Sequence, residues 1–440
     1  MTAGSQNPEL DPVASGTRDV TGPKVSVIVG SIGYRRLLTT LIRAALPTVR
    51  IEEIDPFSQT MRGSGVEFGT GSNVMVLGGI GTESEALSAL ERLRARDDCP
   101  PIIVLVSHDL AAQAELLRAA GAAAIFLKDA LSQNALAAAI SGLSRGQSID
   151  VAPRHYGQFT LDVDGERIAL AIDGYQPLVT MASNEMSHVF LAETLDGSRR
   201  VVIKLPLSTP HHDVNIVRKF CERYACLCKL NGRSVVRYLD AGIAGSWPYV
   251  VLEHLSAGDL RRRMAAGLTS VSALEILHKL AVALADVHAG GFVHMDVKPE
   301  NIFFRDDRTL VLIDFNISTP FGGVARSARG DVLGSPFYMS PEQGRGLPVD
   351  GRSDLYSAGV ILFEMLSGER PFSGENSTQV IFQHLHAEIP LLPKRIRQLQ
   401  PLVDSLLAKN PDERFADSNA LIDALRPHLA NLAGNQPANE

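Results

Sequence analysis

A short polar segment between apolar elements constrains the possible folds of this chain more than any other sequence feature. The segment HMDVKPEN, residues 294–301, follows the apolar helical pattern ALEILHKLAVALADVHAGG and precedes a predicted hairpin, IFFRDDRTLVLIDF. Asp314 lies near the end of that hairpin, thirteen positions after Asn301. Charged and amide side chains therefore lie in loops whose ends are fixed by regular structure.

Length and composition indicate a globular protein with more than one domain. A chain of 440 residues exceeds the size of one hydrophobic core and suggests two or three domains. Hydrophobic residues make up 45% and charged residues 21%, which is enough apolar surface to bury. The net charge is −7 and basic residues do not cluster, so nucleic acid is not an expected partner. The chain has no stretch of about 18 apolar residues and no signal peptide, so we expect a cytoplasmic protein without a membrane segment.

The region from residue 24 to 143 alternates short β-rich runs with amphipathic helical patterns. The runs are KVSVIVG, NVMVLGG and PIIVLVS, and the helical patterns are EALSALERLRAR, AQAELLRAAG and QNALAAAISGL. This alternation predicts an α/β fold with a doubly wound parallel sheet. Its order and lengths, above all in IIVLVSHDLAAQAELLRAAGAAAIFLKDAL, resemble the receiver domain of response regulators.

The resemblance to a receiver does not extend to its carboxylates. Family members hold magnesium on two carboxylates near the end of the first strand and accept phosphate on another at the end of the third. Here those strands lead into Gly30-Ser31 and Gly78-Gly79, although Ser107 and Lys128 match the family's hydroxyl and lysine positions. We therefore expect a pseudo-receiver that binds a regulatory protein or forms a homodimer. A phosphorylatable receiver and an unrelated flavodoxin-like domain are the alternatives.

A change in composition separates this region from the rest of the chain. Residues 144–175 shift to Gly and Asp and include Pro153. Two alternating runs around Asp164-Gly165 predict a connector that carries a small hairpin. The second domain is expected from residue 176 to 429, and the polar residues 430–440 are expected to form a disordered tail.

The second region carries a set of motifs in one order. Besides HMDVKPEN and Asp314, they are VVIK ending at Lys204, GSPFYMSPE ending at Glu342, DLYSAGVILFEMLSGERPF starting at Asp354, and LLAKNPDERF with Arg414. Together they resemble protein kinases, most closely the Hanks-type Ser/Thr kinases of bacteria. The resemblance implies a two-lobed α+β domain that transfers the γ-phosphoryl group of ATP to protein substrates. Within it, Asp354 would hold the backbone of the catalytic loop, and Glu342 would pair with Arg414.

The resemblance also implies a role for each polar side chain of the site. Asp296 would be the catalytic base, Lys298 would steady the transferring phosphate, and Lys204 would hold the α- and β-phosphates. Asn301 and Asp314 would bind Mg²⁺, which prefers hard oxygen ligands. The presence of Lys298 indicates specificity for Ser and Thr rather than Tyr.

Nucleotide contacts are implied at three further places. The phosphate-covering loop places Ala182, Asn184 and Ser187 at the family's glycine positions and is followed by Val189. The hinge that meets adenine would be residues 252–255, which include Glu253 and Leu255, and Asp259 would approach the ribose or the substrate backbone.

The phosphate-covering loop is the most serious departure from the family pattern, because ASNEMSHV contains no glycine. Backbone N–H groups remain to meet phosphate, whereas the conformational freedom of glycine is lost. The substitution predicts ATP binding weakened by roughly ten- to thirtyfold, with the chemistry retained.

Three other departures concern control of the site. Met295 replaces the arginine that usually gathers a phosphorylated activation loop, so activity should depend less on phosphorylation of Ser327 or Ser335. Asn316 stands where the metal-binding loop usually has glycine. In the regulatory helix, Arg223 takes the place of the glutamate that pairs with Lys204, and the neighbouring Glu222 is displaced by one position.

Two functions follow from these patterns. An active Ser/Thr kinase requires the residues that catalyse transfer and bind metal, and these are present: Asp296, Lys298, Lys204, Asn301 and Asp314. A pseudokinase scaffold would signal by binding partners through two degenerate domains. A small-molecule kinase of similar architecture is disfavoured by GSPFYMSPE, which resembles a platform for protein substrates.

Overall fold

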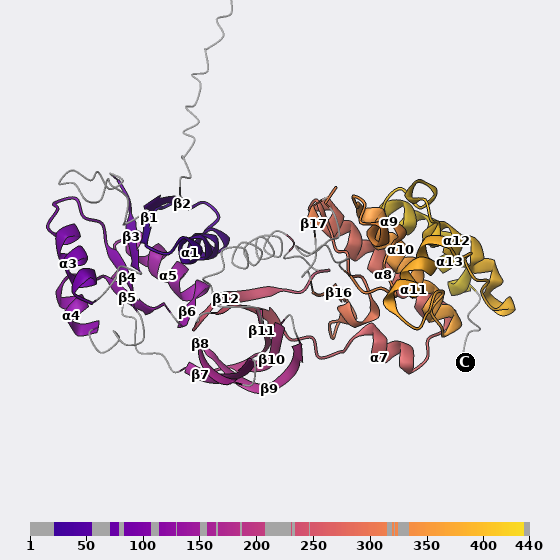
Figure 1. Ribbon diagram of the computed structural model, residues 1–440, viewed down its shortest axis with the longest axis horizontal. Coiled ribbons are helices and arrows are strands. Elements are labelled where there is room, and N and C mark those ends of the chain that lie inside the picture. Colours follow the sequence, from indigo (N-terminus) through magenta and orange to yellow (C-terminus); the bar gives the residue numbers. More distant parts are fainter. Residues whose placement is uncertain are drawn as a thin grey trace, which may run out of the picture. The chain divides into compact units, whose positions relative to one another are not determined.

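The computed structural model describes two compact units (Figure 1). The described residues are 22–54, 71–78, 83–106, 114–128, 130–149, 156–163, 166–184, 187–206, 230, 234–245, 247–314, 319–320, 322–323 and 334–434. The first unit contains described residues from 22–31, 42–126 and 135–149. The second contains residues 32–41, 127–134 and the described chain from residue 156 onward.

A five-stranded sheet forms the centre of the first unit, in the order β2-β1-β3-β4-β5. Strand β1 pairs in parallel with β2 and with β3, and β3 pairs in parallel with β4. Strands β3 and β4 are buried along their whole length, which is typical of parallel strands in α/β folds. The strands are β1 (Lys24–Val29), β2 (Arg50–Ile54), β3 (Val74–Gly78), β4 (Ile102–Val106) and β5 (Ala124–Leu127), and the helices of this region are α1 (Ile32–Ala45), α3 (Glu83–Arg94), α4 (Ala114–Ala119) and α5 (Gln133–Ser144).

A six-stranded antiparallel sheet opens the second unit, in the order β6-β12-β13-β11-β10-β9. In β11, Val201, Ile203 and Leu205 are buried on one face, and Lys204 therefore points to the other face. The strands are β6 (Ala130–Ser132), β9 (Tyr175–Asn184), β10 (Ser187–Thr194), β11 (Arg200–Pro206), β12 (Tyr238–Ala244) and β13 (Trp247–Glu253). Ahead of them, β7 (Tyr156–Val163) and β8 (Glu166–Asp173) pair as an antiparallel hairpin.

A helical lobe follows and is organised around one buried helix, α10 (Gly351–Ser367). Its residues from Ser353 to Leu366 are all buried, as expected of a helix surrounded by protein. Helix α8 (Ser270–Ala289) begins at Thr269, whose hydroxyl accepts from the Ser272 backbone N–H at 3.1 Å. The remaining strands and α-helices are α7 (Leu260–Ala265), β14 (Phe292–Val293), β15 (Ile302–Phe304), β16 (Leu310–Leu312), β17 (Thr319–Pro320), α9 (Pro341–Arg345), α11 (Ser377–His386), α12 (Gln400–Leu407) and α13 (Ser418–Gly434), and short 3-10 helices span Pro299–Asn301, Lys394–Leu399 and Pro411–Glu413.

Strand β6 joins the edge of the antiparallel sheet from a distant part of the sequence. Its residues pair with β12 in the register Gly242↔Ser132, Ile243↔Leu131 and Ala244↔Ala130. The approach requires glycine at 242, because a Cβ there would lie 1.9 Å from the Leu131 carbonyl oxygen. The segment that follows β5 is therefore part of the same sheet as Lys204.

A buried carboxylate, Asp240, stabilises the pairing of β6 with β12. Its Oδ2 accepts from the Ser132 hydroxyl at 2.9 Å, and its Oδ1 accepts from the Ala241 and Asn134 backbone N–H groups at 2.8 and 3.2 Å. Burial raises the pKa of Asp240 to about 6, although these hydrogen bonds oppose the rise, and the negative charge of Asp173 adds to it. Burial, followed by the charges of Asp240 and Asp173, also raises the pKa of the nearby Tyr175 phenol.

None of the described helices is long and apolar enough to cross a bilayer.

The raised pKa of Asp240 predicts a dependence of stability on pH. Because the folded protein binds this proton more tightly than the unfolded chain, the free energy of unfolding should fall as pH rises from about 4 to about 6. Asp240→Asn removes the titrating group, while the amide oxygen still accepts from backbone N–H groups. Relative to this variant, the free energy of unfolding of the wild type should fall by on the order of 3 kcal/mol between pH 4 and pH 7.

Urea unfolding at both pH values, followed by the fluorescence of Trp247, measures this difference. Trp247 is the one tryptophan of the chain and lies in β13, within the affected sheet. Asp97→Asn, at an exposed aspartate, is the matched control and should reproduce the wild-type curve. If the free energies of unfolding of wild type and Asp240→Asn differ by the same amount at pH 4 and at pH 7, Asp240 does not have a raised pKa.

Candidate active site

The loop that carries Asp296 is held by a buried carboxylate from α10. Asp354 is fully buried and accepts from the His294 and Met295 backbone N–H groups, both at 2.9 Å. Its Oδ2 also lies 2.8 Å from His288 Nε2. These bonds help to stabilise Met295 in a left-handed backbone conformation, with φ of 69°, which is costly for a residue other than glycine. The predicted role of Asp354 is confirmed.

Four hydrogen bonds orient the carboxylate of Asp296. Lys298 Nζ donates to Oδ2 at 2.6 Å and Asn301 Nδ2 donates to the same oxygen at 3.0 Å. On Oδ1, the Ser335 backbone N–H and hydroxyl donate at 3.0 and 2.8 Å. Burial opposes ionisation of Asp296, but the charge of Lys298 and these hydrogen bonds outweigh it and lower the pKa below its ordinary value. Asp296 is therefore an oriented anion at neutral pH.

Lys204 and Asp314 form an ion pair beside this loop, with Nζ 2.8 Å from Oδ1. The two loops are tied together, because the Ile313 N–H donates to the Asn301 carbonyl at 3.0 Å and the Ile313 carbonyl lies 3.0 Å from His294 Nε2. Asn301 uses its amide nitrogen to bond Asp296, which leaves the amide oxygen for another partner. One amide oxygen and one carboxylate suit Mg²⁺, which binds to few protein ligands and completes its shell with phosphates and water.

The strands that flank the phosphate-covering loop pair antiparallel despite its lack of glycine, with register shifts between Val189 and Phe190 and between Leu191 and Ala192. Strands β9 and β10 pair from Tyr175 up to Asn184, which lies opposite Ser187, and Ala182 lies opposite Val189. Ala182 and Ser187 have extended strand backbone and are absent from the described non-glycine residues with positive φ. The expected strain of replacing glycine therefore does not arise at these two positions. Residues 185–186 lie outside the described chain.

The side chains of the predicted hinge residues and of Asp259 contact other residues of the protein. The Glu253 carboxylate accepts from the Arg237 N–H at 2.7 Å and from Arg305 Nε at 3.1 Å. Leu255 is 9% exposed and belongs to the helical-lobe core. Asp259 caps α7, where its Oδ1 accepts from the Arg262 N–H at 2.8 Å. Any contact of Glu253 with adenine would thus use its backbone.

Comparison with known proteins identifies this arrangement. Residues 175–424 match the family model of the protein kinase domain, which is more than half of the chain. The chain belongs to the protein kinase family. The match begins at Tyr175, so the hairpin β7–β8 and the residues before it lie outside the matched region.

Several bacterial kinases are similar over the same region. Serine/threonine-protein kinase PknL of Mycobacterium tuberculosis is 32% identical over 271 residues, which cover 60% of this chain and 68% of PknL. PknB of Mycolicibacterium smegmatis is 33% identical over 58% of this chain and 43% of its own length. PrkC of Bacillus subtilis is 31% identical over 55% of this chain and 38% of its own length.

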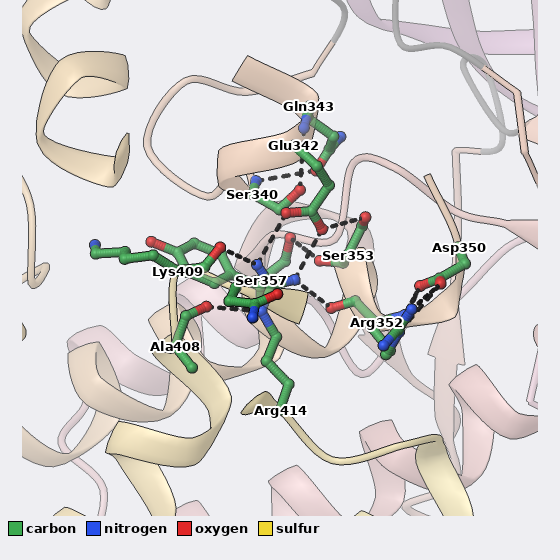
Figure 2. Close-up of polar contacts among 12 residues, drawn as sticks. Ser340, Glu342, Gln343, Asp350, Arg352, Ser353, Ser357, Ala408, Lys409 and Arg414 are labelled. Atoms are coloured by element: carbon green, nitrogen blue, oxygen red, sulfur yellow. Dashed lines mark hydrogen bonds and ion pairs between the residues drawn. The ribbon is translucent and has the colours of Figure 1, made fainter. Parts of the chain in front are cut away.

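A buried ion pair between Glu342 and Arg414 joins two segments of the helical lobe (Figure 2). Arg414 Nη1 and Nη2 donate to the two Glu342 carboxylate oxygens at 2.8 and 2.9 Å, and the Ser353 hydroxyl donates to Oε1 at 2.6 Å. Burial opposes ionisation of Glu342, but Arg414 outweighs it and lowers the carboxyl pKa. The predicted pairing of Glu342 with Arg414 is confirmed. Next to Glu342, Gln343 Nε2 donates to the Met295 carbonyl at 2.9 Å, which connects this brace to the catalytic loop.

Arg261 is a residue of the site that sequence reasoning did not single out. Its guanidinium donates to Glu300 Oε1 and Glu364 Oε1, both at 2.8 Å, and to the Tyr338 hydroxyl. It therefore links α7, the catalytic loop and α10. No motif quoted from the sequence contains Arg261, although Glu300, Glu364 and Tyr338 all lie inside such motifs.

Several residues of interest lie outside the described chain. They are Ser107, Glu222, Arg223, Asn316 and Ser327.

Ser335 provides a test of how Asp296 is oriented. Its hydroxyl donates to Asp296 and accepts from Lys298 Nζ at 2.8 Å. Ser335→Ala removes both bonds but keeps the backbone N–H, so we expect kcat to fall about tenfold and the KM for ATP to change less than about twofold. Steady-state kinetics against a generic protein substrate measures both values. Ser335→Thr retains the hydroxyl and is the matched control; equal activity in wild type and Ser335→Ala would show that the hydroxyl does not orient the carboxylate.

Arg414 provides a test of the brace. Arg414→Ala leaves the Glu342 carboxylate buried without its partner, so we expect the free energy of unfolding to fall by about 3–5 kcal/mol. Chemical denaturation measures the loss, and Arg426→Ala, at a side chain 72% exposed on α13, should change stability by less than about 0.5 kcal/mol. A loss below about 1 kcal/mol in Arg414→Ala would mean that water or another side chain replaces the guanidinium.

Proposed function

We propose that this protein transfers the γ-phosphoryl group of ATP to serine and threonine hydroxyls of protein substrates. The observation that carries the proposal is the hydrogen-bonded anion Asp296, held between Lys298, Asn301 and Ser335. The curated relatives PknL, PknB and PrkC are described as serine/threonine-protein kinases, which supports the same activity here.

Each charged residue has a part in such a reaction. Asp296 would orient the substrate hydroxyl and accept its proton, which its lowered pKa permits at neutral pH. Lys298 would offset negative charge on the transferring group. Lys204, whose Nζ lies 2.8 Å from Asp314 Oδ1, would contact the α- and β-phosphates.

Asn301 and Asp314 would hold Mg²⁺, and their oxygen atoms suit this ion. Bound Mg²⁺ would neutralise negative charge on the phosphate oxygens. Ala182, Asn184, Ser187 and Val189 would cover the phosphates and adenine from the strands β9 and β10, mainly through the backbone.

Met295 supports activity that does not rely on a phosphorylated activation loop. Its side chain is 3% exposed and packs in an apolar cluster with Val293 and Val349. An apolar side chain in that place offers no charge for a phosphate. The rival function, a pseudokinase scaffold, is less well supported, because the residues that bind charge and accept the proton are retained.

We further propose that the region before the kinase domain is a pseudo-receiver that docks a regulatory protein or a second copy of this chain. The strand order β2-β1-β3-β4-β5 supports this assignment, because flavodoxin-like receivers share it. Strand β3 ends at Gly78, which has no carboxylate to accept phosphate. The proposed location is the cytoplasm, where ATP is available.

Phosphate transfer from labelled ATP tests the proposed activity. With Mg²⁺ present, the wild type should label itself or a generic protein substrate, and Asp296→Asn should reduce the rate at least about a hundredfold. Asp423→Asn, at an aspartate 65% exposed on α13, is the matched control and should retain wild-type activity. Absence of labelling that depends on Asp296 would favour the scaffold.

A further inference from the structure

The hairpin of β7 and β8 has one apolar face. In β7, Phe159 and Leu161 are fully buried, and in β8 Leu170 and Ile172 are at most 4% exposed, whereas Thr160 between the first two is exposed. This period of two is the pattern of a strand pair that covers another surface. A two-stranded hairpin is marginally stable alone in water, so its apolar face needs a partner.

The partner of this face is the kinase sheet. Phe159 and its three apolar neighbours form one core cluster with side chains from β10, β11, β12 and β13. The Phe159 and Phe190 rings meet edge to face, with centroids 5.4 Å apart. Figure 1 shows β7 and β8 curving together with β9, β10 and β11. The sheet that carries Lys204 is therefore covered by residues outside the region that matches the kinase family.

The covered face is the one opposite to the nucleotide-facing residues. In β11, Ile203 and Leu205 belong to the cluster and Lys204 lies between them. In β10, Phe190 belongs to the cluster and the preceding residue, Val189, lies directly opposite Lys204 across the strand pair. Because side chains alternate along a strand, the hairpin presses on one face while Val189 and Lys204 project from the other.

On the same face of the sheet, His188 and Ser183 connect the apolar cluster to the strand ends of the phosphate-covering loop. His188 is 2% exposed, its ring centroid lies 6.3 Å from that of Phe190, and its Nδ1 lies 2.9 Å from the Ser183 hydroxyl. Ser183 and His188 are opposite each other in the pairing of β9 with β10. A packed path therefore leads from Phe159 through Phe190 and His188 to the strand ends that hold the glycine-free loop.

We propose that the hairpin Tyr156–Asp173 is a positioning element of the nucleotide site. By packing on β10 and β11 it fixes the places of Val189, Lys204 and the phosphate-covering loop. A loop without glycine has less freedom to adapt to phosphate, so its affinity depends on strands that are already in place. The functional kinase accordingly begins upstream of the residues that match its family. The kinetic test of this inference rests on the proposed kinase function, whereas the hydrogen-exchange test does not depend on it.

Kinetics of full-length variants test the positioning role. Phe159→Ala should raise the KM for ATP about tenfold while kcat changes less than about twofold, because Asp296 and its partners are untouched. Phe159→Leu keeps most of the apolar contact and should remain within about threefold of the wild-type KM. Thr160→Ala, on the exposed face of the same strand, should match the wild type.

A second core variant separates positioning from general loss of stability. Leu425→Ala removes a fully buried side chain from α13 in the helical lobe and should lower the melting temperature without raising the KM for ATP. If Phe159→Ala and Leu425→Ala change the KM equally at matched fractions folded, the hairpin is only structural and the proposal is overturned.

Amide hydrogen exchange tests the proposal without any enzymatic activity. Phe159→Ala should increase exchange in β10 and β11 and leave α10 unchanged, whereas Leu425→Ala should leave β10 and β11 protected. Unchanged exchange in β10 and β11 of Phe159→Ala would overturn the proposal even if the kinase is active. Conversely, a wild type that transfers no phosphate would end the kinase proposal, and the exchange result would still decide the role of the hairpin.

Discussion

The catalytic half of this kinase depends on one buried carboxylate that binds two backbone N–H groups. Asp354 comes from the buried helix α10 and fixes His294 and Met295, and the polypeptide then turns so that Asp296 meets Lys298 and Ser335. A buried charge is tolerated there because strong donors surround it. The position of the loop that carries Asp296 is therefore set by the rigid helix α10 and not only by hydrogen bonds within the loop. The ion pair of Glu342 with Arg414 fixes the segment around Glu342 in a similar way.

Much of this site could be predicted from sequence because its contacts join motifs of fixed spacing. Asp354 and the Glu342–Arg414 pair could be assigned from their motifs before any contact was known. The ion pair of Lys204 with Asp314 could not, since neither motif shows which anion the lysine meets. Arg261 could not be assigned from sequence either, because its three partners, Glu300, Tyr338 and Glu364, lie far away in the sequence.

The fold of the nucleotide-binding lobe was less predictable than its chemistry. The alternation in residues 156–173 indicates strands with an apolar face, but periodicity does not reveal which surface that face covers. Likewise the three residues of β6 lie between a strand and a helix of the preceding region, and their pairing with β12 is a long-range contact. Such contacts are fixed by tertiary packing and by single permissive positions such as Gly242, which no local pattern identifies.

The apolar surroundings of Met295 limit which side chains its position can accept. Its side chain is enclosed with Val293 and Val349, its carbonyl is bound by Gln343, and its backbone is left-handed. Met295→Arg would place a guanidinium among aliphatic groups, where a charge is strongly disfavoured unless partners surround it. A charged side chain at this position would therefore need new polar partners in place of Val293 and Val349.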